Sequence, residues 1–360
     1  MPTIGMPKVK ISFESMGLTA IQRSERGVVL LLLKTAEPSE VGQYKYTSLA
    51  DIPEEQEFSA DVKKYINLAF EASPHKMMIE IYDEGTRTLE SALKKMAMMK
   101  FNYYSAPNAA AEDLQKILSW QKSVVQEKDK TCKFVAFKEI ADDETIIDWE
   151  VDNITYDDVV YTGQEFTALV ASQLAALPLT RSFTYFTWPK LTQADLPFSE
   201  DEDEAVNQGK LFLTYDGEKY KIARGVNSLT TYSEDKGEDF SKIRVVEAMH
   251  LIKDDIRQTW ENDYAGKILN KYENKQQFIA LVNQVYFKQL QDAVLDAEGN
   301  SHVDIDLVGN RAYAIQRGAD VEKMTEMEIK TYNTGSNIFL TGTVSILDAM
   351  EDLTIKFRNL

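Results

Sequence analysis

A regular alternation of strand and helix patterns between residues 28 and 176 constrains the fold of this chain more than any other feature. It begins with residues 28–33, a continuous run of Val and Leu that is typical of a strand buried on both faces. The elements expected after it are helix 59–71, strand 76–82, helix 88–98, strand 102–105, helix 110–125, strand 134–137 and helix 164–176. Strands that alternate with helices predict a mostly parallel sheet with helices on its faces, so this part of the chain is expected to be α/β.

A hairpin and a polar run follow the alternating region. Strands 211–215 and 220–224 are joined around Asp216-Gly217, a dipeptide typical of tight hairpin turns. The composition then becomes strongly polar over residues 232–239. We therefore expect a domain boundary at this point.

The part beyond the boundary is expected to be α+β. Ser241 is a candidate N-cap for a first helix, whose apolar stripe comprises Ile243, Val246, Met249, Ile252, Ile256 and Trp260. A second helix with one apolar face is expected over 278–294, and strands are expected at 303–307 and 338–347. The fold class expected for the whole chain is therefore α/β followed by α+β.

Both ends of the chain carry the alternating pattern of a strand with one apolar face. The apolar positions are Val9, Ile11 and Phe13 near the N-terminus, and Leu353, Ile355 and Phe357 near the C-terminus. Two interpretations fit this pattern. The terminal strands can pair within their own domain, or they can be donated to a neighbouring molecule.

Composition and charge exclude several classes of function. The chain has 58 acidic and 40 basic residues and a formal charge of −18; such a surface repels phosphate backbones, so no nucleic-acid partner is expected. Cys132 is the only cysteine, which excludes an intramolecular disulfide, and we expect a buried structural thiol. The most apolar run is too short to cross a bilayer and no signal-peptide pattern is present, so no membrane insertion is expected.

Motifs for catalysis or for binding a cofactor or metal are not found. The three histidines lack metal-ligand spacing: His75, His250 and His302. Gly209-Lys210 lacks the remaining residues of a phosphate-binding loop. The acidic run 199–204 has Val206 where an EF-hand needs its turn glycine, so we expect a solvated acidic loop. No catalytic residues, no cofactor, no metal and no nucleotide-dependent activity are therefore expected.

Three segments resemble the sheath proteins of contractile tails. Residues 23–29 (RSERGVV) are similar to the opening of these proteins. Residues 225–232 (GVNSLTTY) and 236–247 (KGEDFSKIRVVE), with the helix that holds 254–257 (DDIR), resemble the junction into their C-terminal domain. The similarity is greatest to the short sheaths of clostridial and Bacillus prophages and of phage-tail-like bacteriocins. It covers essentially the whole chain, without the large outer insertions of many sheaths.

The resemblance implies a structural subunit that polymerises around an inner tube in an extended, metastable state and then contracts to drive the tube through a cell envelope. It implies an arm at 1–22, an α/β domain at 23–232, a C-terminal domain at 233–347 and an arm at 348–360. The arms would be donated to the C-terminal domain sheet of neighbouring subunits. The acceptor residues in that sheet would be Val303, Ile305, Leu307, Ile338, Leu340 and Val344.

Hinges and partners also follow from the resemblance. Flexible hinges are expected at Gly17 and at 348–352, and a contact with the tube is expected around 266–275. The implied partners are copies of the same chain in a helical homo-oligomer, the inner tube protein, and baseplate and terminator proteins. The implied location is a virion or phage-tail-like particle that is assembled in the bacterial cytoplasm and released by lysis.

Two other functions stay open at this stage. An α/β enzyme of unknown chemistry would need a polar cluster at the carboxyl ends of the strands, which the sequence does not indicate. A tail tube or capsid-associated subunit would be smaller and mainly β, which the long α/β region disfavours.

Overall fold

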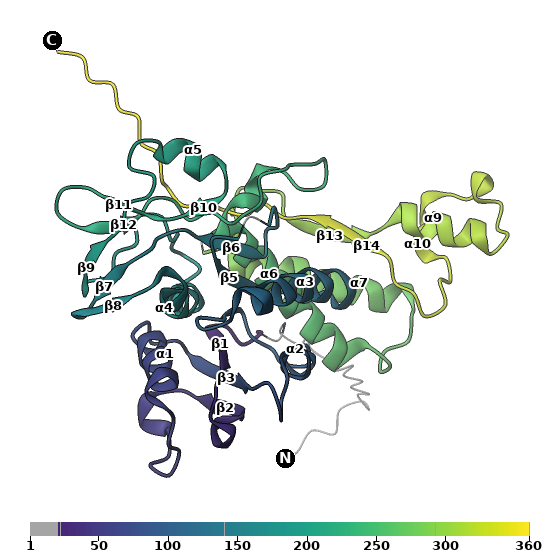
Figure 1. Cartoon of the computed structure of the whole chain (residues 1–360). Helices are drawn as coiled ribbons and strands as arrows, with labels where there is room; N and C mark the ends of the chain where they lie inside the picture. The colour runs from purple at the N-terminus through teal and green to yellow at the C-terminus, as the bar shows by residue number, and fades with distance from the viewer. Residues whose placement is uncertain (1–20, 22, 140, 292, 360) are drawn as a thin grey trace, which may run out of the picture. The chain divides into compact units, whose positions relative to one another are not determined.

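The computed structural model describes residues 21, 23–139, 141–291 and 293–359 (Figure 1). The expected N-terminal strand with Val9, Ile11 and Phe13, and the expected hinge at Gly17, lie outside these residues. The described residues form two compact units. Unit 2 comprises 24–254 and 346–359, and unit 1 comprises 255–345 with Ile21 and Arg23. The domain boundaries expected after residues 22, 232 and 347 stay predictions.

A seven-stranded sheet forms the centre of unit 2. Its strand order is β10-β6-β5-β4-β1-β3-β2, and every neighbouring pair is parallel except β2 with β3. The strands are β1 (Val28–Lys34), β2 (Gly42–Tyr46), β3 (Lys76–Tyr82), β4 (Tyr103–Ser105), β5 (Lys133–Phe137), β6 (Ile146–Trp149) and β10 (Lys210–Leu211). The mostly parallel sheet predicted from the strand–helix alternation is confirmed.

Helices cover both faces of this sheet, because successive side chains of a strand point to opposite sides (Figure 1). The odd-numbered side chains of β1 pack in one core with α1 (Ala60–Phe70) and α4 (Gly163–Ala176). The even-numbered side chains pack in a second core with α2 (Leu89–Met96) and α3 (Ala111–Lys128). The side chains of residues 28–33 thus point alternately into two apolar cores, which explains why this run has no polar positions.

Two smaller antiparallel sheets complete unit 2. One has β7 (Ile154–Tyr156) between β8 (Val159–Tyr161) and β9 (Leu191–Ala194). The other is the predicted hairpin, β11 (Leu213–Tyr215) with β12 (Tyr220–Ile222). Its turn contains Gly217 at a φ of +97°, which glycine adopts without strain.

Helix α5 (Glu202–Asn207) corrects one expectation from the sequence. The acidic run 199–204 is expected to be a loop, but its second half is the first turn of this helix. Acidic side chains in a first turn interact favourably with the positive end of the helix dipole. The carboxylates therefore help to begin a helix here.

Helix α6 (Ile243–Thr259) has residues in both units. Ser241 does not cap it, contrary to the prediction; it lies in a short 3₁₀ turn (Glu238–Ser241) and its hydroxyl donates to the carbonyl of Glu238 at 2.7 Å. A π-helical turn, Trp260–Tyr264, extends the helix. No helix in the described part of the chain is long and apolar enough to cross a lipid bilayer.

The second predicted helix of the α+β region consists of three pieces in unit 1. It begins as α7 (Tyr272–Ala280), continues as a π-helical turn (Leu281–Tyr286) and ends as α8 (Phe287–Leu290). The apolar stripe predicted for it is buried, since Phe278, Leu281 and Leu290 are at most 5% exposed.

A two-stranded antiparallel sheet, β13 (His302–Ile305) with β14 (Leu340–Thr343), follows in unit 1. Helices α9 (Leu307–Gln316) and α10 (Glu326–Thr331) lie between the two strands in the sequence. Both strands are shorter than the sequence predicts. The first ends early because the Oδ1 of Asp306 accepts from the backbone N–H of the second residue of α9 at 2.9 Å and caps that helix.

Candidate assembly site

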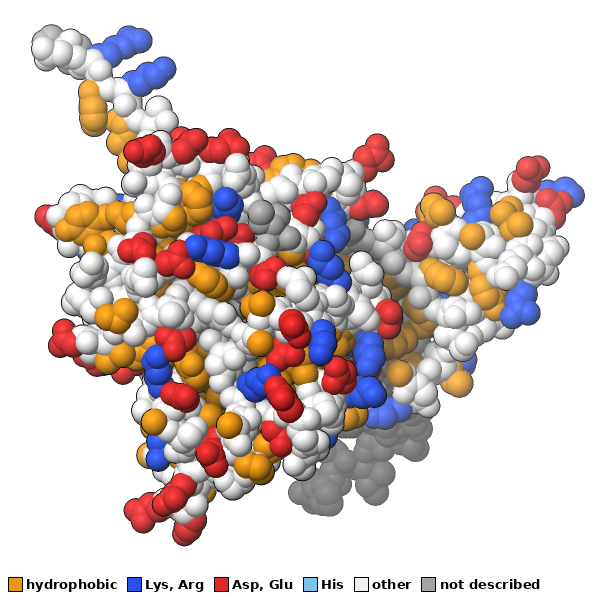
Figure 2. All heavy atoms as spheres, viewed as in Figure 1, with side chains coloured by type: hydrophobic (Ala, Val, Ile, Leu, Met, Phe, Trp, Pro, Cys, Tyr) orange, Lys and Arg blue, Asp and Glu red, His pale blue; other side chains and the backbone are white. Residues whose placement is uncertain are grey.

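The last described residues, 353–359, form neither helix nor strand. Their apolar side chains are exposed: Leu353 by 83%, Ile355 by 57% and Phe357 by 90%. Figure 2 shows the end of the chain reaching away from the body of unit 2. The predicted strand is therefore absent from the single subunit, because a strand needs a hydrogen-bonding neighbour and no described residue supplies one. Pairing within the described part of its own subunit, one of the two interpretations of the pattern, is not observed.

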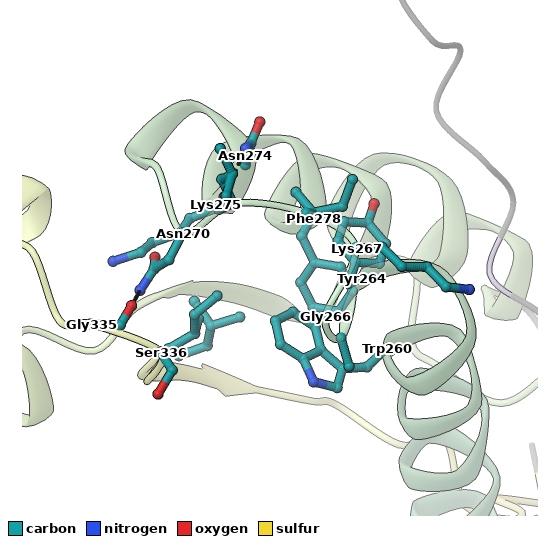
Figure 3. A pocket seen from close by; sticks show the side chains of 15 residues that line it. Trp260, Tyr264, Gly266, Lys267, Asn270, Asn274, Lys275, Phe278, Gly335 and Ser336 are labelled. Carbon is teal, nitrogen blue, oxygen red and sulfur yellow. Dashed lines mark hydrogen bonds between the residues drawn. The ribbon is translucent and has the colours of Figure 1, made fainter.

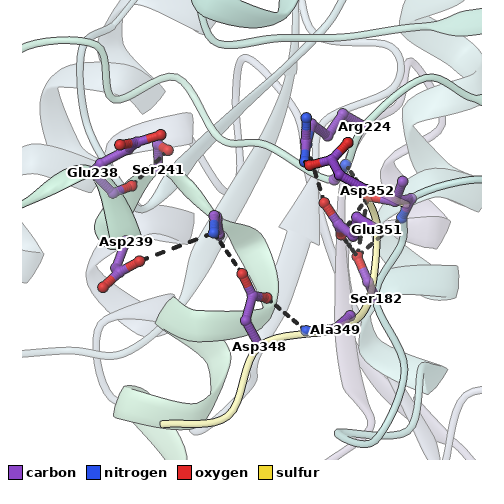
Figure 4. A network of polar contacts seen from close by, with 12 residues as sticks. Ser182, Arg224, Glu238, Asp239, Ser241, Asp348, Ala349, Glu351 and Asp352 are labelled. Atoms are coloured by element: carbon purple, nitrogen blue, oxygen red, sulfur yellow. Dashed lines mark hydrogen bonds and ion pairs between the residues drawn. The ribbon is translucent and has the colours of Figure 1, made fainter. Parts of the chain in front are cut away.

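The segment just before these residues is held by polar contacts (Figure 4). The Oε1 of Glu351 accepts from the hydroxyls of Ser182 and Thr184, both at 2.7 Å. Its Oε2 accepts from the Nε of Arg224 at 3.0 Å, and the Nη2 of the same guanidinium donates to Asp352 at 2.5 Å. The hydrogen bond with Asp352 raises the pKa of Arg224.

Two more contacts hold the segment a few residues upstream. The Nζ of Lys242 donates to the Oδ2 of Asp348 at 2.5 Å, which raises the pKa of the lysine. The guanidinium of Arg244 donates to the carbonyl of Leu347, and burial lowers the pKa of Arg244. Three basic side chains of unit 2 thus contact the segment in which a flexible hinge is expected, 348–352, or the residue directly before it, and the hinge itself stays a prediction. We call these contacts of residues 347–352 the arm anchor.

The segment 225–232, singled out in the sequence, builds the support for the arm anchor. The backbone N–H of Gly225 donates to the Oγ1 of Thr184 at 2.9 Å. Val226 forms an antiparallel bridge with Lys242. The side chain of Asn227, which is fully buried, donates to the carbonyl of Phe240 at 2.7 Å. These bonds bring Arg224, Thr184 and Lys242 to one place.

An aromatic groove of about 430 Å³ lies in unit 1 beside β14 (Figure 3). Three rings form one wall: Trp260 stacks on Tyr264 with centroids 5.8 Å apart, and Phe278 meets both edge-on at 5.3 and 4.8 Å. Ile338 and Leu340 line it as well. We call this hollow the acceptor groove.

One end of the acceptor groove is closed by Asn270, whose Nδ2 donates to the carbonyls of Gly335 and Asn337 at 2.8 and 3.0 Å. The region 266–275, expected to contact a tube, lines the groove and contains Leu269 at 71% exposure. A contact of this region with a tube stays a prediction.

The predicted acceptor residues do not all lie in strands. Val303 and Ile305 are in β13 and Leu340 is in β14, where Ile305 and Leu340 are directly opposite. Ile338 and Val344 flank β14. Leu307 is the first residue of α9 rather than part of the strand. Their role as acceptors stays a prediction.

Comparisons with known proteins decide the family. Residues 235–358 match the model of the phage tail sheath C-terminal domain. Over 98% of its length the chain is 34% identical to the tail sheath protein of Clostridium phage phiCD119, of which it covers 99%. The chain belongs to the phage tail sheath proteins. A sheath protein is a structural component of a tail particle and not an enzyme, so the α/β enzyme left open above is excluded.

Solved structures share the fold of this sheath protein at low sequence identity. The sheath tail protein of Desulfitobacterium hafniense superimposes with a TM-score of 0.68 over 83% of this chain and 94% of its own, at 16% identity. The contracted helical sheath of the anti-feeding prophage gives a TM-score of 0.70 over 99% of each chain, at 11% identity. These matches confirm the mixed α/β and α+β fold predicted for the chain.

The shifted pKa of one carboxylate in this sheath protein, that of Glu247, has a structural explanation. Although burial raises it, the pKa of Glu247 is lowered to about 2 by the charges of Lys133 and Arg26. The described residues include no group of three or more His, Cys, Asp and Glu that could hold a metal ion. The low pKa of Glu247 is therefore explained by charge pairing inside the folded subunit, and no catalytic role is needed to explain it.

Sequence reasoning missed the arm anchor. Its donors, Ser182, Thr184, Arg224, Lys242 and Arg244, are up to 62 residues apart in the sequence and form no motif. The one available signal was the acidic cluster at 348–352 directly before an amphipathic arm. Acidic side chains at the base of an arm indicate a basic partner, but the sequence does not say which one.

Proposed function

We propose that this sheath protein polymerises around an inner tube in an extended, metastable state, and that contraction of the lattice drives the tube through a target envelope. The observation that carries the proposal is the exposed apolar face of Leu353, Ile355 and Phe357 beyond a fixed base. A strand with this pattern is stable only when a partner covers it. In a homo-polymer the partner is a neighbouring subunit.

The acceptor groove fits such a strand. It offers aromatic and aliphatic side chains next to β14, an edge strand of a two-stranded sheet. About five backbone hydrogen bonds at about 1 kcal/mol each, plus burial of the three apolar side chains, give a firm link between subunits. In this proposal Val303, Ile305, Ile338, Leu340 and Val344 form or flank the acceptor sheet, and Leu307 follows it.

The other parts of the proposal concern the N-terminal arm and the partners. Val9, Ile11 and Phe13 would be donated in the same way as the C-terminal arm. The arms at 1–22 and 348–360 would flank domains at 23–232 and 233–347. The partners would be further copies of the chain, the inner tube protein near 266–275, and baseplate and terminator proteins. The particle would be assembled in the bacterial cytoplasm and released by lysis.

Energy for contraction would come from subunit contacts that form only in the contracted lattice. No nucleotide is then needed, in agreement with the missing phosphate-binding motif. A similar fold in the contracted sheath of the anti-feeding prophage supports this assignment.

Electron microscopy of the purified full-length protein tests the proposal. We expect helical tubes, and we expect purified particles to contract without ATP. Discrete small oligomers at all protein concentrations, or contraction that requires ATP, would contradict it.

A further inference from the structure

The base of the C-terminal arm is held more firmly than an ordinary chain terminus. We propose that Arg224 is a positioning residue: it holds Glu351 on its own subunit, so that the strand exchanged between subunits begins at Leu353. The inference rests on the proposed strand donation and adds where the donated strand starts and how far it reaches.

The first observation is the geometry around Glu351. Its side chain is only 12% exposed, and three donors from two separate segments fill its two oxygens. The guanidinium of Arg224 bridges the carboxylates of two consecutive residues, Glu351 and Asp352. Charge-assisted hydrogen bonds of this kind are stronger than neutral ones. The backbone is therefore fixed directly before Leu353.

The second observation is a separate attachment upstream, where Lys242 and Arg244 bind Asp348 and the carbonyl of Leu347. Side chains of unit 2 thus contact the segment near both of its ends. Between the two attachments the side chain of Met350 is fully exposed. Polar contacts, and not burial of this side chain, hold the segment in place.

The reach of the arm follows from this fixed start. The eight residues from Leu353 to the C-terminus span at most about 26 Å when extended. Without the hold on Glu351, but with the upstream contacts of Leu347 and Asp348 kept, the twelve residues from Ala349 onward would span about 40 Å. A shorter tether concentrates the strand near one acceptor and excludes more distant ones. Arg224 thus helps to select the neighbour that receives the arm.

Spin labels on the unassembled full-length protein test the anchor directly. Nitroxides are placed separately at Met350→Cys and at Phe357→Cys, two exposed positions before and after the proposed start of the strand. The native Cys132 is buried. We expect slow motion at 350 and fast motion at 357. Arg224→Gln and the milder Glu351→Gln should speed the motion at 350 towards that at 357.

A matched control removes a positive charge outside the anchor. Lys219→Gln alters an exposed lysine in the turn between β11 and β12 and should leave both label positions unchanged. Equal mobility at 350 and 357 in the parent protein, or no response at 350 to either anchor variant, would overturn the inference.

Polymerisation gives a second readout. Loss of the anchor by Arg224→Gln, or insertion of six Gly and Ser residues after Asp352, lengthens the free arm. Either change should raise the protein concentration needed for tube formation about 2- to 3-fold, because effective concentration falls steeply with tether length. An unchanged concentration for both variants would contradict the proposed reach. Normal tubes from a chain without the arm would instead refute strand donation, whatever the labels show.

Discussion

Arg26 donates from its Nη1 to the Oε1 of Glu247 at 3.2 Å and so joins the segment before β1 to α6. The same carboxylate pairs with Lys133, the first residue of β5, whose side chain is only 1% exposed. Glu247 thus pairs with two positive charges, one on Lys133 in the sheet and one on Arg26 just before the sheet's strand β1. Removal of the Glu247 carboxylate leaves the buried ammonium of Lys133 without its charge partner, whereas Arg26 keeps its ion pair with Asp254 at 3.2 Å.

The substitution Glu247→Gln should therefore destabilise the subunit strongly. We expect a loss of about 3–5 kcal/mol in the free energy of unfolding, measured with urea on unassembled protein. Glu218→Gln, in an exposed turn, serves as the control and should change stability by less than about 0.5 kcal/mol. Equal stability of the two variants would show that Glu247 does not hold this group together.

The ionisation of Asp148 in β6 should make the subunit less stable as the pH rises from about 4 to about 7. Burial, with the charge of Glu150, raises the pKa of Asp148 to about 7, whereas an unfolded aspartate titrates near about 3.9. Between these values the folded state keeps a proton that the unfolded state has lost, so higher pH favours unfolding.

Asp148→Asn tests this pH dependence. An asparagine can still accept the 2.8 Å hydrogen bond from the backbone of Glu139 but carries no proton to lose. Relative to the parent protein, the variant should therefore gain stability between pH 4 and pH 7.5, on the order of 1–3 kcal/mol. Asp203→Asn, an exposed substitution in α5, should show no such gain. A constant difference across this pH range would contradict the assignment.

Cys132 should react slowly with thiol reagents in the native protein. Burial raises the pKa of its thiol to about 11, which leaves little of the reactive thiolate at neutral pH. A cysteine placed at Met98, which is 79% exposed, is the comparison. We expect Cys132 to react about 100-fold more slowly than Met98→Cys. Equal rates would show that the thiol is accessible.

The sheet of unit 2 could be predicted well from the sequence because its signals are local. Residues 76–82 were expected to be a strand and form β3 over the same range. The short strands β6, β7, β8 and β9 were not predicted, because each has only three or four residues and its local pattern is correspondingly weak. The C-terminal residues 353–360 carry a strand pattern whose partner is not in the described chain. Local pattern predicts which face will be buried, but tertiary contacts decide whether a strand forms.

The acceptor groove should be sensitive to charge. Ile338→Lys places an ammonium group beside Trp260 and Phe278, where a donated strand would cover it. The concentration needed for tube formation should rise about tenfold or more, which corresponds to about 1.4 kcal/mol. Val308→Lys is the control, because this valine is 78% exposed in α9 and does not line the groove. Normal assembly of the Ile338→Lys variant would exclude the groove as the acceptor.

Deletion of residues 353–360 tests strand donation most directly. Melting of the unassembled protein and tube formation are measured side by side for the intact chain, for the truncated chain, and for a full-length control with Lys356→Ser and Arg358→Ser on the polar face. We expect the truncated subunit to melt within about 2 °C of the intact one, because no described residue of its own subunit covers the segment. It should form no tubes, whereas the control should form them. A large drop in melting temperature, or normal tubes from the truncated chain, would contradict the account.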